Sequence, residues 1–298
     1  NLCTIGALVT WAVATVAAKV CFGWTWGLST LLGAVLVVTG PTVIMPLLRH
    51  IQPARQVGSV LKWEGILIDP IGAMLALMVF EALLASDDHS IWEIAGLGFG
   101  RMLAIGVLLG VSSGLLLVLF LKRYWVPDYL QNPVALMVVV GAFALSNHWQ
   151  EESGLLTTTI IGITLANQKW VQIRHIVEFK ENLRVLLIGG LFILLAARLD
   201  LNTVRHLSPV AGFAFLMALM LIARPASVFL SSLGSKLKLN DKIFLSWMAP
   251  RGIVAAAVAS IFAQRLADTG HAQALELVPV TFLVIVGTVL LQGITAKP

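Results

Sequence analysis

The feature that most constrains this chain of 298 residues is that its charges cluster in short stretches, with long apolar runs between them. Hydrophobic residues make up 58% of the chain and charged residues 12%, whereas soluble domains average about 45–50% and about 25%. A soluble core could not bury this excess of apolar side chains. The pattern therefore predicts a chain that folds within a lipid bilayer.

Ten apolar segments are predicted to be membrane-spanning helices. A helix needs ~20 residues to cross ~30 Å of hydrocarbon, and most segments reach that length. Strands of a membrane barrel would be ~10 residues long and alternate apolar with polar residues, which these runs do not. We therefore expect an all-α polytopic membrane protein with about ten transmembrane helices, formed by segments 1–18, 27–48, 58–85, 94–121, 133–149, 153–167, 185–197, 208–230, 243–264 and 277–294.

The loops between these segments alternate in charge, which predicts their orientation. One set is basic and contains Arg49, Arg55, Lys62, Lys122, Arg123, Lys169, Arg174, Lys180, Arg184, Lys236, Lys238, Lys242 and Lys297. The other set is acidic or mixed and contains Asp87, Asp88, Glu93, Glu151, Glu152, Arg198, Asp200, Arg205, Arg265, Asp268 and Glu276. The positive-inside rule places the basic loops in the cytoplasm of a cell inner (plasma) membrane protein. The net charge of +5 is then a topology signal, and no nucleic-acid partner is expected.

Several features limit what kind of protein this is. The chain lacks an initiating Met and begins almost inside an apolar segment, so we expect residues 1–298 to be the transmembrane domain of a longer protein, lacking N-terminal helices and any C-terminal cytoplasmic domain. There is no nucleotide-binding or zinc motif, and Cys3 and Cys21 lack metal-ligand spacing. We expect no cofactor and no enzymatic activity.

Two apolar segments contain residues that interrupt a helix. The stretch VVTGPTV holds Gly40 and Pro41, and MAPRGIV holds Pro250, Arg251 and Gly252. An unpaired backbone group in hydrocarbon costs on the order of several kcal/mol. Such breaks are therefore tolerated only where they face protein or a water-filled cavity. Each break alone could be a simple proline kink. Because the two segments run in opposite directions, together they favour a transporter with an inverted repeat.

Two carboxylates lie in the apolar segment that follows the first break. If the helix starts near Gly58, Asp69 is ~16 Å along it and therefore near mid-membrane. A charge at that depth is expensive and indicates function, although a structural ion pair is the alternative. Glu64 lies five residues away, ~140° around the helix. The two carboxylates are therefore expected to do different jobs.

The remaining polar stretches are interpreted as structural. Ser153 and the run Thr157–Thr159 are typical of hydroxyls that pack between membrane helices. Residues 173–184 mix charged and apolar side chains and predict an amphipathic helix on the cytoplasmic interface.

Four motifs in fixed order resemble the monovalent cation/proton antiporter family, in particular the bacterial sodium/proton exchangers of the first cation–proton antiporter class. They are Thr39-Gly40-Pro41, Glu64 to Asp69, Arg224-Pro225 and Pro250-Arg251-Gly252. The resemblance implies two broken helices that cross at Gly40-Pro41 and near Pro250. It assigns the alternating proton and cation site to Asp69, with an oxygen from Thr39. It also pairs Glu64 with a later arginine, of which Arg224 is the first candidate and Arg251 the second.

The chain departs from the family pattern in two places. Members with electroneutral exchange carry Asn before the aspartate and electrogenic ones a second Asp, but here that residue is Ile68. Many members have Asp in the first break, where this chain has Gly40. Both changes remove polar groups from the expected site and leave the identity of the cation open.

The function implied is secondary active antiport. A monovalent cation, with sodium the first candidate and potassium the second, would exchange for protons one for one by alternating access, in a homodimer within the bilayer. A cation channel or a potassium efflux system of related fold is the alternative, and a membrane enzyme a remote one. Coupling between cation and proton flux separates the exchanger from a channel.

Overall fold

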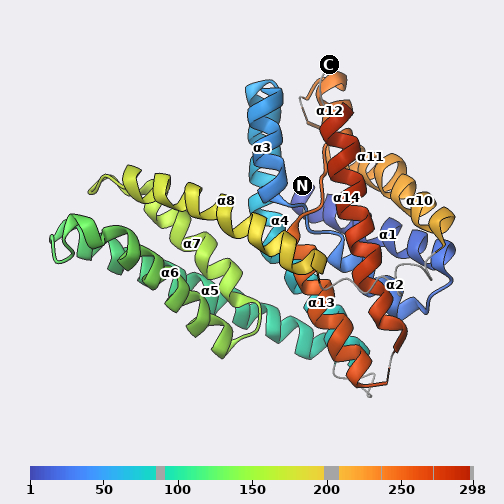
Figure 1. Ribbon diagram of the computed structural model, residues 1–298, viewed down its shortest axis with the longest axis horizontal. Helices are drawn as coiled ribbons and strands as arrows, with labels where there is room; N and C mark the ends of the chain where they lie inside the picture. The colour runs from blue at the N-terminus through green and yellow to red at the C-terminus, as the bar shows by residue number, and fades with distance from the viewer. Residues whose placement is uncertain (85–90, 198–207, 236, 271, 296–298) are drawn as a thin grey trace. The chain divides into compact units, whose positions relative to one another are not determined.

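The computed structural model describes residues 1–84, 91–197, 208–235, 237–270 and 272–295, and all regular elements in them are helices. They form two compact units, shown in Figure 1. The first unit joins Asn1–Leu84 to Leu191–Pro298, and the second is Ala85–Gly190. The all-α fold class is thus confirmed for the described residues.

The first unit begins with a π turn, η1 (Leu2–Gly6), followed by α1 (Ala7–Phe22), α2 (Trp26–Val35), α3 (Pro41–Ile51) and α4 (Arg55–Leu84). Gly23, with φ of 68°, ends α1 in a left-handed conformation that glycine adopts without strain. The side chain of Thr25 then caps α2 by accepting a hydrogen bond from the Leu28 N–H. The predicted segment 27–48 is therefore two helices, separated at residues 36–40.

The C-terminal part of the same unit is α10 (Pro209–Ala218), the π turn η3 (Leu219–Ala223), α11 (Arg224–Ser231), α12 (Leu239–Trp247), α13 (Ile253–Asp268), the 3-10 turn η4 (Ala272–Glu276) and α14 (Leu277–Thr295). The segment predicted at 208–230 is continuous, but its hydrogen bonding shifts at η3, immediately before Arg224. The segment predicted at 243–264 divides into α12 and α13.

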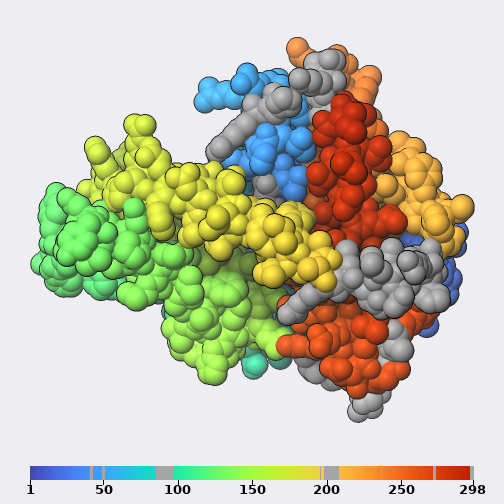
Figure 2. Space-filling view, in the orientation of Figure 1, coloured from blue at the N-terminus to red at the C-terminus, as the bar shows by residue number. Residues whose placement is uncertain are grey.

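Small residues bring the helices of the first unit close together. A Cβ on Gly33 of α2 would lie 2.9 Å from the Trp11 carbonyl oxygen of α1. A Cβ on Gly212 of α10 would lie 2.9 Å from a methyl carbon of Leu283 on α14. Figure 2 shows α14 (red) on the surface of the unit, beside α10 in light orange. Close approach through glycine is the usual way in which membrane helices gain packing contacts.

The second unit contains α5 (Ile91–Lys122), the 3-10 turn η2 (Asp128–Leu130), α6 (Gln131–Trp149), α7 (Ser153–Asn167) and the first part of α8 (Arg174–Ala197). Glycines every fourth residue along α5 face larger side chains of α7. Added Cβ atoms would lie 2.7 Å, 2.6 Å and 2.9 Å from the nearest α7 atoms at Gly106, Gly110 and Gly114, respectively. This glycine stripe sets the close packing of α5 against α7.

Of the hydroxyls predicted to be structural, those of Ser153 and Thr157 link α7 to α6, and those of Thr158 and Thr159 donate to the Leu155 carbonyl within α7. Ser146 and Ser153 share a hydrogen bond of 2.7 Å between their Oγ atoms, and the Thr157 hydroxyl donates to Ser146 Oγ over 2.7 Å. Asn147 Oδ1 accepts from the Gly154 N–H at the start of α7. These contacts are internal to the unit and agree with a packing role.

The helix predicted at residues 173–184 is present, but it is not separate from the apolar segment 185–197. Both belong to α8, which runs without interruption from Arg174 to Ala197. The charged first half continues the same backbone hydrogen-bond ladder as the apolar second half. Periodicity alone marks a change of environment there and does not mark a helix end.

Six helices of the described residues are long and apolar enough to cross a membrane: Leu2–Phe22, Arg55–Leu84, Gly100–Lys122, Asp128–Trp149, Pro209–Ser231 and Gln273–Thr295. Trp26–Val35 and Ser153–Asn167 are shorter apolar helices. Ten spans and an inverted repeat therefore remain predictions. The loop charges predicted at Asp87, Asp88, Arg198, Asp200, Arg205, Lys236 and Lys297 lie outside the described residues.

Candidate functional site at the crossing of two broken helices

The two helix breaks meet in the first unit through their backbones. The Gly40 N–H donates a hydrogen bond to the Pro250 carbonyl oxygen at 3.0 Å. A Cβ on Gly40 would overlap the Cα of Gly252, and a Cβ on Gly252 would overlap the Cα of Gly40. The gap between α2 and α3 therefore crosses the gap between α12 and α13 with no room for a side chain at either glycine.

Local sequence explains why both helices stop here. Pro41 is the first residue of α3, a position where its missing N–H costs nothing because the first turn has no acceptor for it. Gly40 precedes it in an extended conformation, and its carbonyl accepts from the Val43 and Ile44 N–H groups. Gly252 is likewise extended where α13 begins. Each break thus leaves a helix C-terminus and a helix N-terminus near the crossing, with opposite partial charges.

Arg251 belongs to the second break and is buried, with 3% of its surface exposed. Its Nη1 donates to the carbonyl oxygens of Val37 and Val38, at 3.2 and 3.3 Å. Its backbone N–H donates to Thr288 Oγ1 on α14 at 3.3 Å. The guanidinium therefore satisfies carbonyl groups that the interruption after α2 has freed, and it places positive charge at the negative end of that helix.

Arg224 likewise donates to carbonyl groups freed at the other interrupted helix, and it also forms an ion pair with Glu64. Its Nε and Nη2 donate to the Leu245 and Met248 carbonyl oxygens at the end of α12, both at 3.1 Å. Its Nη2 donates to Glu64 Oε2 at 2.9 Å, and its Nη1 donates to Glu64 Oε1. Both side chains are buried. The structure thus joins Glu64 to Arg224, and Arg251 has different partners.

Asp69 lies on α4 where this helix passes the first break. Ile68 belongs to the same buried cluster as Val37. One turn further on, a Cβ on Gly72 would lie 3.2 Å from the Val38 backbone nitrogen. The helix around Asp69 therefore packs directly against the residues that precede Thr39 and Gly40.

Two oxygens in this region have no hydrogen-bond partner among the described residues. They are Asp69 Oδ1 and Thr39 Oγ1, and both atoms are buried. An unsatisfied buried polar group costs about 1–3 kcal/mol, and more for a charged group. Oxygens of this kind suit a proton or a small hard cation. The packing and hydrogen bonding of the described residues do not otherwise account for them.

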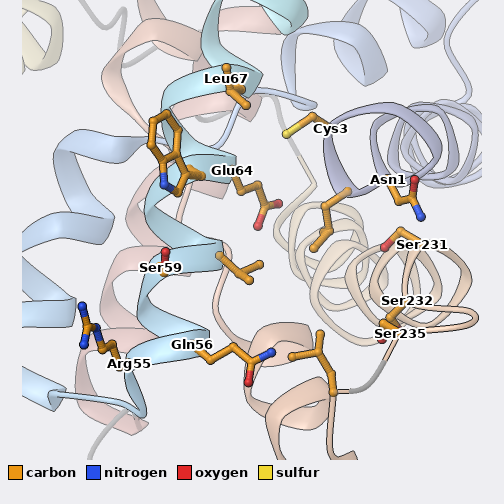
Figure 3. Close-up of a pocket in the computed structure, with 14 residues that line it drawn as sticks. Asn1, Cys3, Arg55, Gln56, Ser59, Glu64, Leu67, Ser231, Ser232 and Ser235 are labelled. Carbon is orange, nitrogen blue, oxygen red and sulfur yellow. The ribbon is translucent and has the colours of Figure 1, made fainter. Parts of the chain in front are cut away.

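A cavity of about 820 Å³ is lined in part by Glu64 of the ion pair. Figure 3 shows Glu64 projecting from α4 toward the facing segments, with Arg55, Gln56 and Ser59 along the same helix and a group of serines opposite. These serines are Ser231, Ser232 and Ser235. The lining continues along α4 as far as Leu67, and Asp69 is not among the lining residues.

Sequence reasoning missed three features of this site. Thr288, which anchors the Arg251 backbone, is an isolated polar residue in the apolar stretch VIVGTVLL, and that isolation could have drawn attention to it. The carbonyl partners of both arginines carry no sequence signal, because every residue has a carbonyl. The π turn at Leu219–Ala223 also has no composition that marks it, although such turns often occur next to functional residues.

The six long apolar helices, together with two interrupted helices that cross among buried charges, define a multi-pass membrane protein. The crossing and its unsatisfied oxygens are typical of transporters that bind ions at broken helices. The chain belongs to the transmembrane sodium/hydrogen exchanger family, whose family model matches residues 1–298. This is a family of transporters and not of enzymes.

Curated relatives agree with this membership. The chain is 28% identical over 261 residues to the K⁺/H⁺ antiporter NhaP of Alkalimonas amylolytica, covering 85% of this chain and 44% of the relative. It is 25% identical over 235 residues to Na⁺/H⁺ antiporter 1 of Methanocaldococcus jannaschii, covering 77% of this chain and 55% of the relative. The chain thus spans about half the length of the curated relatives it matches.

The fold resembles that of a solved antiporter. The structure of the sodium proton antiporter MjNhaP1 from Methanocaldococcus jannaschii at pH 8 superposes with a TM-score of 0.83 at 21% sequence identity. The match covers 99% of this chain and 76% of the solved one. The likeness concerns the arrangement of helices, since identity at this level carries no residue roles.

Proposed function

We propose that this chain is the transport part of a secondary active antiporter that exchanges a monovalent cation for protons by alternating access. The observation that carries the proposal is the pair of buried, unsatisfied oxygens, Asp69 Oδ1 and Thr39 Oγ1, where α4 passes the first helix break. The family membership supports cation and proton exchange in general terms. The assignment of Asp69 as the carrier rests on its position and on the absence of another use for its oxygen.

The chemistry of one carboxylate leads to competition between the two ions. A poorly solvated carboxylate disfavours bare negative charge, so it is stable when it holds either a proton or a cation. Both cannot occupy the same oxygen at once. If the loaded site faces each side of the membrane in turn, release of one ion permits binding of the other, and exchange is one for one.

The remaining charged groups of the site are structural in this proposal. The Glu64 carboxylate is neutralised by Arg224, and Arg251 Nη1 donates to the Val37 and Val38 carbonyl oxygens, so both arginines have other partners in this arrangement. Thr39 would add a hydroxyl or backbone oxygen to the cation. Sodium is the first candidate and potassium the second, and relatives named for each cation are both present among the matches.

Location and assembly belong to the same proposal. The alternating charge of the loops supports a cell inner membrane protein with the basic loops in the cytoplasm. A homodimer is proposed from the family resemblance.

The test is coupled flux with the full-length protein in proteoliposomes that contain a pH-sensitive dye. An antiporter moves protons only when sodium or potassium is supplied on the opposite side, and the two salts rank the cations. Cation flux that proceeds at the same rate with no counterflow of protons would instead establish the channel alternative.

A further inference from the structure

A second pocket lies in the other unit, at the ends of its membrane-length helices. It occupies about 660 Å³ between the segment that joins α5 to α6 and the segment that joins α7 to α8. Figure 1 shows these two segments, green and yellow-green, at the same end of the helix group. We call it the loop pocket; it is lined in part by Lys122, Asp128, Gln131, Asn132, Trp170 and His175.

The helix lengths place the loop pocket at the surface of the bilayer. Lys122 is the last residue of one span, and Asp128 is the first residue of the next. Trp170 follows shortly after the end of the apolar helix α7. Tyr124 lines the pocket, and Trp125 and Tyr129 belong to the same connection between α5 and α6; all three side chains are exposed. Aromatic residues of this kind concentrate at the level of lipid head groups.

The pocket presents one positive and one negative side chain, Lys122 and Asp128, and each contacts a different neighbour. The Lys122 ammonium lies 5.4 Å from the centroid of the Trp170 ring, a cation–π contact that holds the charge near the pocket wall. Asp128 Oδ1 accepts a hydrogen bond of 2.8 Å from Gln131 Nε2, which fixes the carboxylate. Asn132 Oδ1 is buried without a hydrogen-bond partner among the described residues.

From this arrangement we infer that the loop pocket binds a zwitterionic head group with a phosphate and a primary ammonium, as in a phosphatidylethanolamine lipid. Lys122 would receive the phosphate. The ammonium has three N–H donors for the Asp128 carboxylate and the free Asn132 acceptor. The apolar tails of the lipid would continue beside α5 and α6 into the hydrocarbon.

The same chemistry discriminates against other head groups. A choline head group carries the positive charge but has no N–H to donate to Asp128 or Asn132. A glycerol head group can donate from hydroxyls but brings no positive charge to balance Asp128. An inorganic phosphate ion would pair with the Lys122 ammonium but would be repelled by the Asp128 carboxylate.

The experiment measures lipid retention by the full-length protein after delipidation in detergent, using native mass spectrometry. Phosphatidylethanolamine, phosphatidylcholine and phosphatidylglycerol with identical acyl chains are offered in equal amounts. We expect phosphatidylethanolamine to be retained about tenfold over phosphatidylcholine, the effect of one hydrogen bond to a charged group. Asp128→Asn should remove this preference, and Lys122→Gln should weaken retention of all three lipids.

Two kinds of control accompany these variants. Asp128→Glu keeps the carboxylate and should retain the preference, which separates lost recognition from a misfolded loop. Asp241→Asn and Lys242→Gln, on α12 of the other unit, should leave retention unchanged. Soluble phosphoethanolamine and inorganic phosphate are added as competitors to separate the head group from phosphate alone.

The outcomes divide cleanly. Displacement of the lipid by phosphoethanolamine but not by phosphate supports recognition of the head group, and a preference confined to the intact lipid supports the same site with a contribution from the tails. Equal retention of all three lipids, an unchanged preference in Asp128→Asn, or displacement by inorganic phosphate alone would overturn the proposal.

Discussion

At the scale of single residues, two carboxylates of α4 differ in their hydrogen-bond partners. Glu64 is buried against a guanidinium that meets both of its oxygens, whereas Asp69 keeps a buried oxygen with no partner in the described residues. The first arrangement fixes a negative charge, and the second leaves a place for a proton or cation. Their difference follows from helix geometry, since five residues turn the side chain ~140° around the axis.

Replacement of Asp69 tests its role as carrier. Asp69→Asn keeps the size of the side chain but removes its negative charge, so it cannot hold a cation and a proton by turns. We expect cation-dependent proton flux in proteoliposomes to fall to background while the variant remains folded by size exclusion and thermal melting. Asp241→Asn, a change at a partly exposed position on α12, serves as the matched control. Wild-type exchange in folded Asp69→Asn protein would remove Asp69 from the mechanism.

Replacement of Glu64 tests the structural pair. Glu64→Ala leaves Arg224 as an uncompensated buried charge, and breaking such a pair costs about 3–5 kcal/mol. We expect Glu64→Ala to lower the melting temperature more than Asp69→Asn does, because Asp69 has no ion pair among the described residues. The measurement is thermal unfolding of purified protein in detergent. A Glu64→Ala protein as stable as wild type but inactive would assign Glu64 to transport chemistry.

At the scale of elements, the crossing depends on two glycines that touch. Gly40→Ala or Gly252→Ala would place a Cβ onto the backbone of the other break, and backbone atoms cannot turn aside as a flexible side chain can. We expect either change to reduce both the melting temperature and the exchange rate strongly. Gly162→Ala, in α7, is the control: its Cβ meets nothing within 4 Å. That control should change stability by less than about 1 kcal/mol. Normal exchange by Gly252→Ala would show that the crossing has room for a side chain at this glycine.

The sequence reveals features that depend on local residue properties, and it does not reveal contacts that form only when the chain folds. Gly40-Pro41 and Pro250 to Gly252 indicate helix breaks because proline lacks an N–H and glycine tolerates close approach, both local properties. The all-helical class follows from the lengths of the apolar runs. The partners of Arg251 could not be inferred, since they are backbone carbonyls brought near only by folding. Local sequence also does not show that α8 continues unbroken where its residues change from charged to apolar.

At the scale of the whole molecule, the stoichiometry of exchange depends on how many groups carry protons. Ile68, in the position before Asp69, cannot titrate and is buried against Val37. Glu64 is held in its ion pair. If Asp69 is the one group that cycles, as proposed, one monovalent cation would exchange for one proton and no net charge would cross.

Electroneutral exchange has a direct electrical test. Vesicles are clamped at different potentials with valinomycin and potassium gradients, and sodium-driven proton flux is measured in each. We expect the steady-state proton gradient to be independent of voltage, since one charge moves in each direction. A steep dependence on voltage would require a second proton-carrying group, with Glu64 the first to examine by substitution.

The crossing of the broken helices is held mostly by main-chain atoms. The Pro250 carbonyl accepts from the Gly40 N–H, and both arginines donate to carbonyls of the opposing or adjoining segment. Main-chain groups are common to all residue types. Substitutions around the crossing therefore leave these bonds in place as long as the two glycines and the two arginines remain. Evolutionary drift can thus replace most of the surrounding side chains without moving the helices. A chain only 21% identical to a solved antiporter can in this way share its architecture at a TM-score of 0.83.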